Sequence, residues 1–146
     1  MKWGAPAEVF AQLAGHWMLD RCVDGRLLMA GQASFGANDD GSLTYQEQGQ
    51  VRLASGASFA AGRAYLFRQR PTGLAVFFIE HPPRLFHDVA LTQAGDALAG
   101  DARHLCKADL YLSRYEFWAD GRFSVRHDVS GPRKDYALAT TYCRMG

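Results

Sequence analysis

The feature that most constrains this chain is the regular return of glycine, asparagine and aspartate between short segments rich in Val, Phe, Tyr, Trp and Thr. From Gly15 onward these segments are roughly seven to twelve residues long, which is typical of β-strands joined by tight turns. The breaks stand at Asp24-Gly25, Asn38-Asp39-Asp40-Gly41, Ser55-Gly56, Pro71-Thr72-Gly73, Pro82-Pro83, Gly95-Asp96, Lys107-Ala108, Asp120-Gly121 and Gly131-Pro132. They predict about ten strands whose connections are too short for parallel crossovers.

A meander of that many antiparallel strands in 146 residues leaves unpaired edges unless it closes on itself. We therefore predict an all-β fold, a closed antiparallel up-and-down barrel of about 8–10 strands with room inside for one small ligand. Only residues 7–13 have helical character, because Val9, Phe10 and Leu13 fall at helical spacing and Gly15 follows as a stop. The chain reads as a single domain over residues 1–146 with a short N-terminal helix.

Composition excludes several classes of partner. The formal net charge is +1 and the charges are scattered, so the basic stripe that binds nucleic acid is missing. No apolar run approaches the ~20 residues needed to cross a bilayer, and we expect no membrane partner. Residues 1–8 lack the apolar stretch of a secretory signal, which favours a cytoplasmic protein. The three cysteines show no C-x-x-C spacing, so we expect buried free thiols rather than disulfides or a zinc knuckle.

The segment 43–53 alternates clearly between an apolar and a polar face. The apolar face carries Leu43, Tyr45, Glu47, Gly49, Val51 and Leu53. A carboxylate on that face is costly without a cation, so Glu47 needs a partner inside the barrel. A three-residue loop that pairs Leu53 with Phe59 sets Glu47 opposite Tyr65, with Arg63 diagonally beside it. We predict an inward Glu47–Arg63 pair, which either anchors a ligand or is a satisfied ion pair.

A second polar group is predicted from the later hairpins. The segment 85–92 points Leu85, His87, Val89 and Leu91 inward. Tight turns at 95–96 and 107–108 then place His87 opposite His104 and His104 opposite Tyr111, with Cys106 facing Asp109 alongside. These are residue types that zinc accepts, but no dense ligand motif supports a metal, and we predict neither metal nor cofactor.

The last hairpins bring further candidates to the same interior. A bulged loop after Asp120-Gly121 pairs Tyr115 with Val125 and Ser113 with His127, so His127 is expected to point inward. The turn 130–136 then carries Arg133 and Tyr136 at the barrel rim. This turn is either a solvated loop bent by Gly131-Pro132 or a rim that offers those two side chains to a ligand.

Two features together resemble a known family. Gly15-His16-Trp17 resembles the G-x-W signature of lipocalin-like, or calycin, barrels, in which an arginine near the last strand packs over the tryptophan; Arg144 or Arg133 would do so here. The longer resemblance rests on Leu13-Ala14-Gly15-His16-Trp17, Gly31-Gln32-Ala33-Ser34-Phe35, Leu43-Thr44-Tyr45-Gln46-Glu47, Arg63-Ala64-Tyr65, Phe86-His87, His104-Leu105-Cys106-Lys107-Ala108-Asp109-Leu110-Tyr111 and Gly131-Pro132-Arg133-Lys134-Asp135-Tyr136. From about Leu13 to Arg144 the chain is similar to an uncharacterised family of small bacterial and fungal lipocalin-like proteins, a domain of unknown function. The resemblance implies a barrel and no particular reaction.

We therefore expect the barrel to bind a small, partly apolar ligand, with an anionic or otherwise polar end, in its lumen. The expected ligand contacts are Glu47, Arg63, Tyr65, His87, His104, Tyr111, Tyr115, His127, Arg133 and Tyr136. The alternative is a small isomerase, dehydratase or cyclase in which His87 or His104 is the general acid or base and Tyr111 stabilises an oxyanion. A third interpretation is an interaction barrel with a filled core, and the sequence is compatible with a homodimer.

Overall fold

The computed structural model describes residues 3–145 and confirms the all-β prediction. A short 3-10 helix (Pro6–Glu8) and α1 (Val9–Gln12) precede eleven strands. The strands are β1 (Gly15–Val23), β2 (Arg26–Ala37), β3 (Leu43–Arg52), β4 (Ser58–Arg70), β5 (Gly73–Phe78), β6 (Arg84–Ala90), β7 (Thr92–Ala94), β8 (Ala97–Cys106), β9 (Asp109–Phe117), β10 (Phe123–Ser130) and β11 (Asp135–Arg144). Neither helix in this part of the chain is long and apolar enough to cross a membrane.

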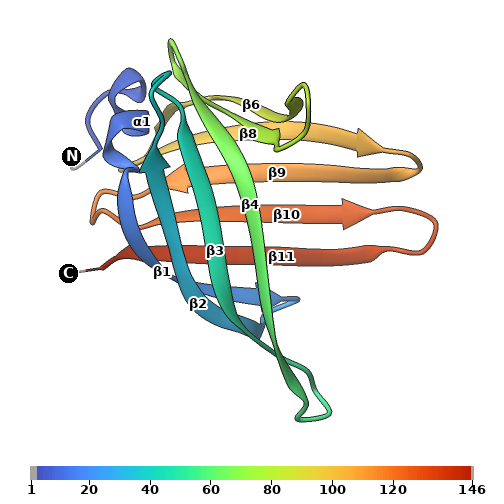
Figure 1. Ribbon diagram of the computed structural model, residues 1–146. Coiled ribbons are helices and arrows are strands. Elements are labelled where there is room, and N and C mark those ends of the chain that lie inside the picture. Colours follow the sequence, from blue (N-terminus) through green and yellow to red (C-terminus); the bar gives the residue numbers. More distant parts are fainter. Residues whose placement is uncertain (1–2, 146) are drawn as a thin grey trace.

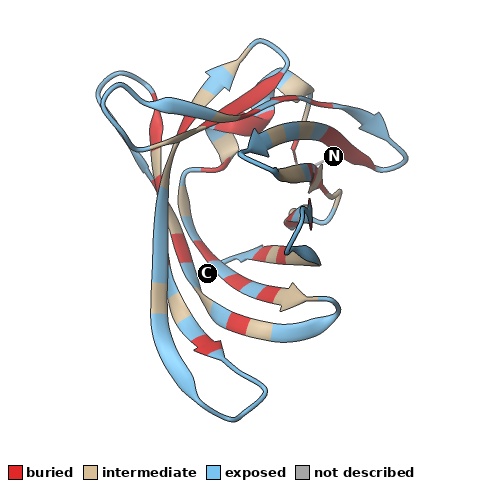
Figure 2. Cartoon of the chain, turned by 90° about the vertical axis from the view of Figure 1, so that its right-hand side faces the viewer, coloured by how far each residue is buried: buried red, intermediate tan, exposed pale blue. Residues whose placement is uncertain are grey.

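All strands belong to one antiparallel sheet in the order β6-β5-β4-β3-β2-β1-β11-β10-β9-β8-β7. Every strand pairs with its neighbour in sequence except β6 and β7, which form the two edges, and β1 also pairs with β11, so the first and last strands lie side by side. In Figure 1 strands β1 to β4 run across strands β8 to β11 at a steep angle. In Figure 2 buried and exposed positions alternate along several strands, which is the pattern of a sheet with one covered face.

Residues 84–94 connect the two edges of the sheet, and Leu91 divides this segment into two strands. Its first half, β6, pairs with β5, and its second half, β7, pairs with β8. This division explains why the structure has one strand more than the expected upper number. Among the described residues β6 forms no ladder with β8, so the barrel is nearly closed and keeps a seam between these two strands.

The N-terminal helices cover one end of the barrel with aromatic side chains. The rings of Trp3 and Trp17 stack at 6.0 Å, and the Trp17 ring meets Phe123 edge-on at 4.9 Å. The indole N–H of Trp17 donates to the carbonyl oxygen of Leu13 at 2.9 Å. The guanidinium carbon of Arg144 lies 4.1 Å from the centre of the Trp17 ring, the cation–π contact that the resemblance implies.

The predicted register of the β3–β4 hairpin is wrong by two residues. Val51 faces Phe59 and Glu47 faces Arg63 directly, because the loop is longer than expected. Within it the Leu53 N–H donates to the carbonyl oxygen of Ala57 at 2.8 Å. A shift of two residues preserves the alternation of faces, so Glu47 and Arg63 still share one face of the sheet. The predicted pairings across β8, β9 and β10 are confirmed.

Gly31 in β2 lies at a close approach to β3, where a Cβ atom would come within 2.2 Å of the carbonyl oxygen of Gln48. We expect Gly31→Ala to lower the free energy of unfolding by roughly 2–3 kcal/mol, because backbone must move to make room. Gly36→Ala in the same strand is the control, since no heavy atom lies within 4 Å of its Cβ position. It should be neutral or raise stability by about 0.4–1 kcal/mol. Urea unfolding compares the two, and equal effects would contradict the steric argument.

Candidate functional site

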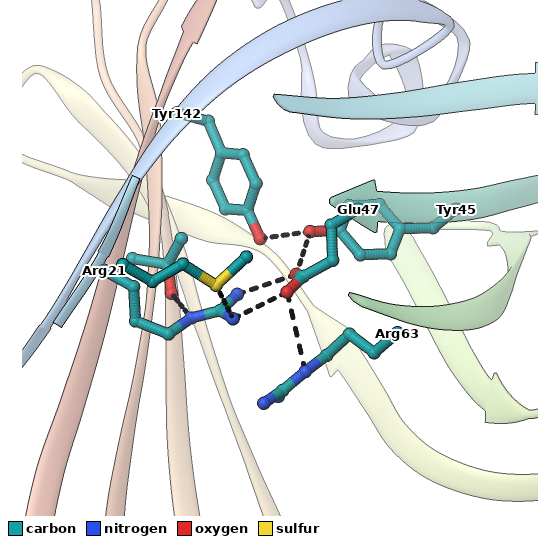
Figure 3. A network of polar contacts seen from close by, with 7 residues as sticks. Arg21, Tyr45, Glu47, Arg63 and Tyr142 are labelled. Carbon is teal, nitrogen blue, oxygen red and sulfur yellow. Dashed lines mark hydrogen bonds and ion pairs between the residues drawn. The ribbon is translucent and has the colours of Figure 1, made fainter. Parts of the chain in front are cut away.

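A buried ion pair between Arg21 of β1 and Glu47 of β3 occupies the wall of the barrel interior (Figure 3). The Nη1 and Nη2 atoms of Arg21 donate to Oε2 and Oε1 of Glu47 at 2.6 and 2.7 Å. The Nε atom of Arg21 donates to the Thr140 hydroxyl on β11 at 2.8 Å. This two-point geometry is the strongest form of an arginine–carboxylate contact.

The predicted Glu47–Arg63 pair is present as a long ion pair, but it is not the principal contact of Glu47. Arg63 lies opposite Glu47, but its Nε is 3.6 Å from Oε2 and its side chain is 43% exposed. Arg21 is the principal partner and was not predicted. The sequence contained a signal for this position. Trp17, Leu19 and Arg21 are spaced two residues apart, so all three point to the same, buried face of β1.

Two tyrosine hydroxyls extend the cluster. The Tyr45 hydroxyl donates to Oε1 of Glu47 at 2.6 Å and lies 2.8 Å from the Tyr142 hydroxyl. Burial favours a raised pKa for Glu47, but the hydrogen bonds and charge of Arg21, together with the Tyr45 hydroxyl, hold that pKa below its usual value. Burial raises the pKa of Tyr142 to about 12. Glu47 is therefore ionised and Tyr142 neutral at neutral pH.

The histidine cluster is arranged differently from the predicted row. A bulge in β6 lets Leu85 and His87 pair with consecutive residues of β5, with Phe86 as the extra residue between them. Leu85, expected inside, is 45% exposed as a result. Phe86 turns inward, and its ring stacks on His87 at 3.7 Å and meets His104 at 5.1 Å. His87 does not pair with His104, whereas His104 faces Tyr111 as predicted.

Two of these histidines are bonded to hydroxyl groups inside the barrel. The Nδ1 atom of His87 lies 2.6 Å from the Tyr115 hydroxyl, and Nδ1 of His127 lies 2.6 Å from the Ser113 hydroxyl. His87 is only 1% exposed and its Nε2 has no hydrogen-bond partner. Burial lowers the pKa of His87 to about 3 and the pKa of His127 to about 4, so both rings are neutral at neutral pH.

The rim turn is tied to the β9 strand by its lysine. The Nζ atom of Lys134 lies 3.1 Å from Oδ2 of Asp109 and donates to the Tyr111 hydroxyl at 3.5 Å. Arg133 is exposed and Tyr136 is half-buried.

The thiols and acidic groups do not form a metal centre. Cys106 faces Asp109 as predicted, but the thiols of Cys106 and Cys143 are exposed, contrary to the expectation of buried thiols. Within residues 3–145 no three side chains of His, Cys, Asp or Glu are grouped to hold a metal ion.

A cavity of about 50 Å³ lies inside the barrel. It has room for a few water molecules at about 10–15 Å³ each. The predicted site residues on its wall are Glu47, Arg63, Tyr65, Tyr115 and His127, and they are joined there by Arg21, Tyr45, Thr140 and Tyr142. His87, His104, Tyr111, Arg133 and Tyr136 lie outside this lining.

Comparison with known families matches residues 13–144 to the family of unknown function DUF6314. This chain belongs to DUF6314. The match covers the segment over which the sequence resembles an uncharacterised barrel family. No curated protein matches the chain. Because DUF6314 has no described activity, the function of this member has to be inferred from its cavity.

Replacing Glu47 in this DUF6314 protein tests the importance of the ion pair. We expect Glu47→Gln to lower the free energy of unfolding by about 3–5 kcal/mol, because it leaves the Arg21 guanidinium buried without a counter-charge. The matched control is Glu80→Gln, which removes a carboxylate from an exposed pair with Arg84. Chemical denaturation should show no measurable change for the control. A Glu47→Gln protein as stable as the control would show that Arg21 finds its solvation elsewhere.

The buried histidines predict how the stability of this DUF6314 member depends on pH. In the unfolded chain they titrate near 6.5, whereas in the fold the pKa of His87 is about 3 and that of His127 about 4. The unfolded state thus binds more protons between these values, so stability is complete above about pH 6.5 and falls as the pH drops toward 4. Each histidine contributes a slope of up to about 1.4 kcal/mol per pH unit.

Urea unfolding at several pH values measures that slope. We expect His127→Gln to reduce it by up to about 1.4 kcal/mol per pH unit. His16→Gln, at an exposed position of β1, should leave it unchanged. A slope that His127→Gln does not alter would mean that other groups produce the acid sensitivity.

Proposed function

We propose that this protein binds a small, partly apolar molecule in the lumen of its barrel. The observation that carries the proposal is the cavity itself, which is bounded by aromatic rings on one side and by the Arg21–Glu47 cluster on the other. Ligand sites in proteins commonly combine a mostly apolar wall with a few fixed polar groups. In a barrel whose interior only had to be packed, apolar side chains would fill this space without the desolvation cost of a buried ion pair.

The apolar wall comes from the layer next to the plugged end. Its side chains are Phe35, Phe67, Phe117, Phe123 and Val125. The polar groups lie nearer the turns at the opposite end, where Arg63 is half-exposed. This arrangement of apolar and polar walls predicts the orientation of the ligand. Its apolar part would point toward the N-terminal helices, and its polar part toward the turns at the opposite end.

The cavity is smaller than the roughly 300–1,000 Å³ of common small-molecule sites, so a ligand must be small or must displace a side chain. Phe86 is the side chain best placed to move. It lines the cavity, it is the extra residue of a bulge, and its strand forms no ladder with β8 on the seam side.

Filling the cavity tests the proposal. Val125 lines the cavity from β10, and Val125→Phe adds a ring to that space. We expect it to abolish binding of any ligand found in a panel of medium-chain alcohols, amides, amines and carboxylates, as measured by calorimetry. Leu112→Phe is the control, because Leu112 lies on the neighbouring strand β9 and is 48% exposed. Circular dichroism should show retained sheet in both variants.

Two results would contradict the proposal. If no member of the panel binds the wild-type protein, the lumen is a packed core and the interaction-barrel interpretation is favoured. If binding survives Val125→Phe unchanged, the ligand lies elsewhere on the molecule.

Acid–base catalysis in the same cavity is a second candidate, and one observation favours it. His127 lines the cavity, and its low pKa keeps the ring neutral and able to accept a proton at neutral pH. The base would therefore be His127 rather than His87, which the cavity does not reach. For a bound molecule that is converted, His127→Asn should lower kcat with little change in affinity. A kcat that is unaffected would exclude this role.

A further inference from the structure

We infer that the lumen selects a singly charged anion of the carboxylate class, held by the terminal nitrogens of Arg63. This inference rests on the proposed function, since it names the chemical class of the ligand that the cavity takes. It follows from the charges on the cavity wall and from which of their hydrogen-bonding atoms are already used.

The cavity wall carries an unequal number of charges. Its ionisable side chains are Arg21, Tyr45, Glu47, Arg63, Tyr65, Tyr115, His127 and Tyr142. Tyrosine is neutral at neutral pH, and the buried imidazole of His127 is neutral as well. Two guanidinium groups then face one carboxylate. The wall has a net charge of one positive unit, and a ligand with one negative charge would balance it.

Arg21 cannot be the group that takes the ligand. Its Nη1 and Nη2 atoms donate to both oxygens of Glu47, and its Nε donates to Thr140. Glu47 is equally occupied, because Oε1 also accepts from Tyr45 and Oε2 also faces Arg63. These two residues therefore form a closed unit with its charges matched.

Arg63 is the group with free capacity. Only its Nε approaches Glu47, at 3.6 Å, and Figure 3 shows its two terminal nitrogens on the side away from that carboxylate. Among the described residues neither terminal nitrogen makes a hydrogen bond, and the ion pair to Glu47 is recorded at Nε. A guanidinium edge with free N–H groups matches the two oxygens of a carboxylate, whereas an amine would be repelled.

The surroundings of Arg63 limit the charge and size of the ligand. A dianion would bring one excess negative charge close to Glu47, so a single charge is the better match. The cavity wall also includes Tyr65, Phe86 and Leu138, which offer ring faces and methyl groups to an apolar tail. The ligand class is thus a small carboxylic acid with an apolar body.

Matched ligands test the inference directly. Octanoate, octanamide and 1-octanol share an apolar chain but differ in charge, and calorimetry at neutral pH and low salt compares their affinities. We expect octanoate to bind the wild-type protein at least about tenfold more tightly than the neutral pair. Arg63→Gln should remove that preference, and Arg63→Lys should retain part of it because the charge remains.

Arg103→Gln is the matched control, because Arg103 is an exposed arginine of β8 that does not line the cavity. It should leave the preference unchanged. Neutral ligands that bind as tightly as octanoate, or a preference that survives Arg63→Gln, would overturn the anion inference while the proposed function stands. If none of the three binds the wild-type protein and the wider panel also fails, the proposed function itself is wrong. Thermal unfolding of both Arg63 variants confirms that they are folded.

Discussion

The ion pair between Arg21 and Glu47 is the interaction on which the interior depends. Two charges taken out of water are stable only when their hydrogen-bonding atoms are all used. Here the pair joins β1 to β3, and Thr140 connects it to β11, so three strands must hold their register to satisfy it. A slip of one residue in β1 or β3 would turn one charged group outward and leave the other buried alone, and a slip in β11 would remove the Thr140 hydroxyl from Arg21. The pair thus specifies the arrangement of the barrel as much as it stabilises it.

Because Arg21 and Glu47 are bonded to each other, a ligand would have to bind side chains next to this pair. Each nitrogen of Arg21 already donates to Glu47 or Thr140, whereas the terminal nitrogens of Arg63 make no hydrogen bond among the described residues and its side chain is half-exposed. Phe86 packs inward from β6, the strand that forms the seam with β8. The cavity is thus bordered by a fully paired charged cluster and, at Phe86, by a strand that lacks a ladder on one side.

The alternation of apolar and polar residues predicted the barrel. It also predicted that Glu47 and Arg63 share the inner face, because a register error of two residues leaves every side chain on the same face of the sheet. The turn at Lys107, with its positive φ of 55°, is tight, so the pairings on either side of it were also predictable. The pairing of His87 with His104 failed because a bulge at Phe86 adds one residue, which no period of two can reveal. Arg21 was missed although it shares the inward face of Trp17 and Leu19, since a charged residue near the end of a strand is usually solvated.

The two buried polar systems respond to pH in different ways, and this separates stability from binding. Burial keeps His87 and His127 neutral at neutral pH, and it raises the pKa of Tyr142 to about 12. Near neutral pH the positive unit on the cavity wall therefore stays constant, because the low pKa of His127 keeps its ring neutral and the lowered pKa of Glu47 keeps its carboxylate ionised. Mild acid weakens the fold by protonating the histidines of the unfolded chain before it charges His127 in the fold. Any pH dependence of affinity in that range must then come from the ligand's own titration.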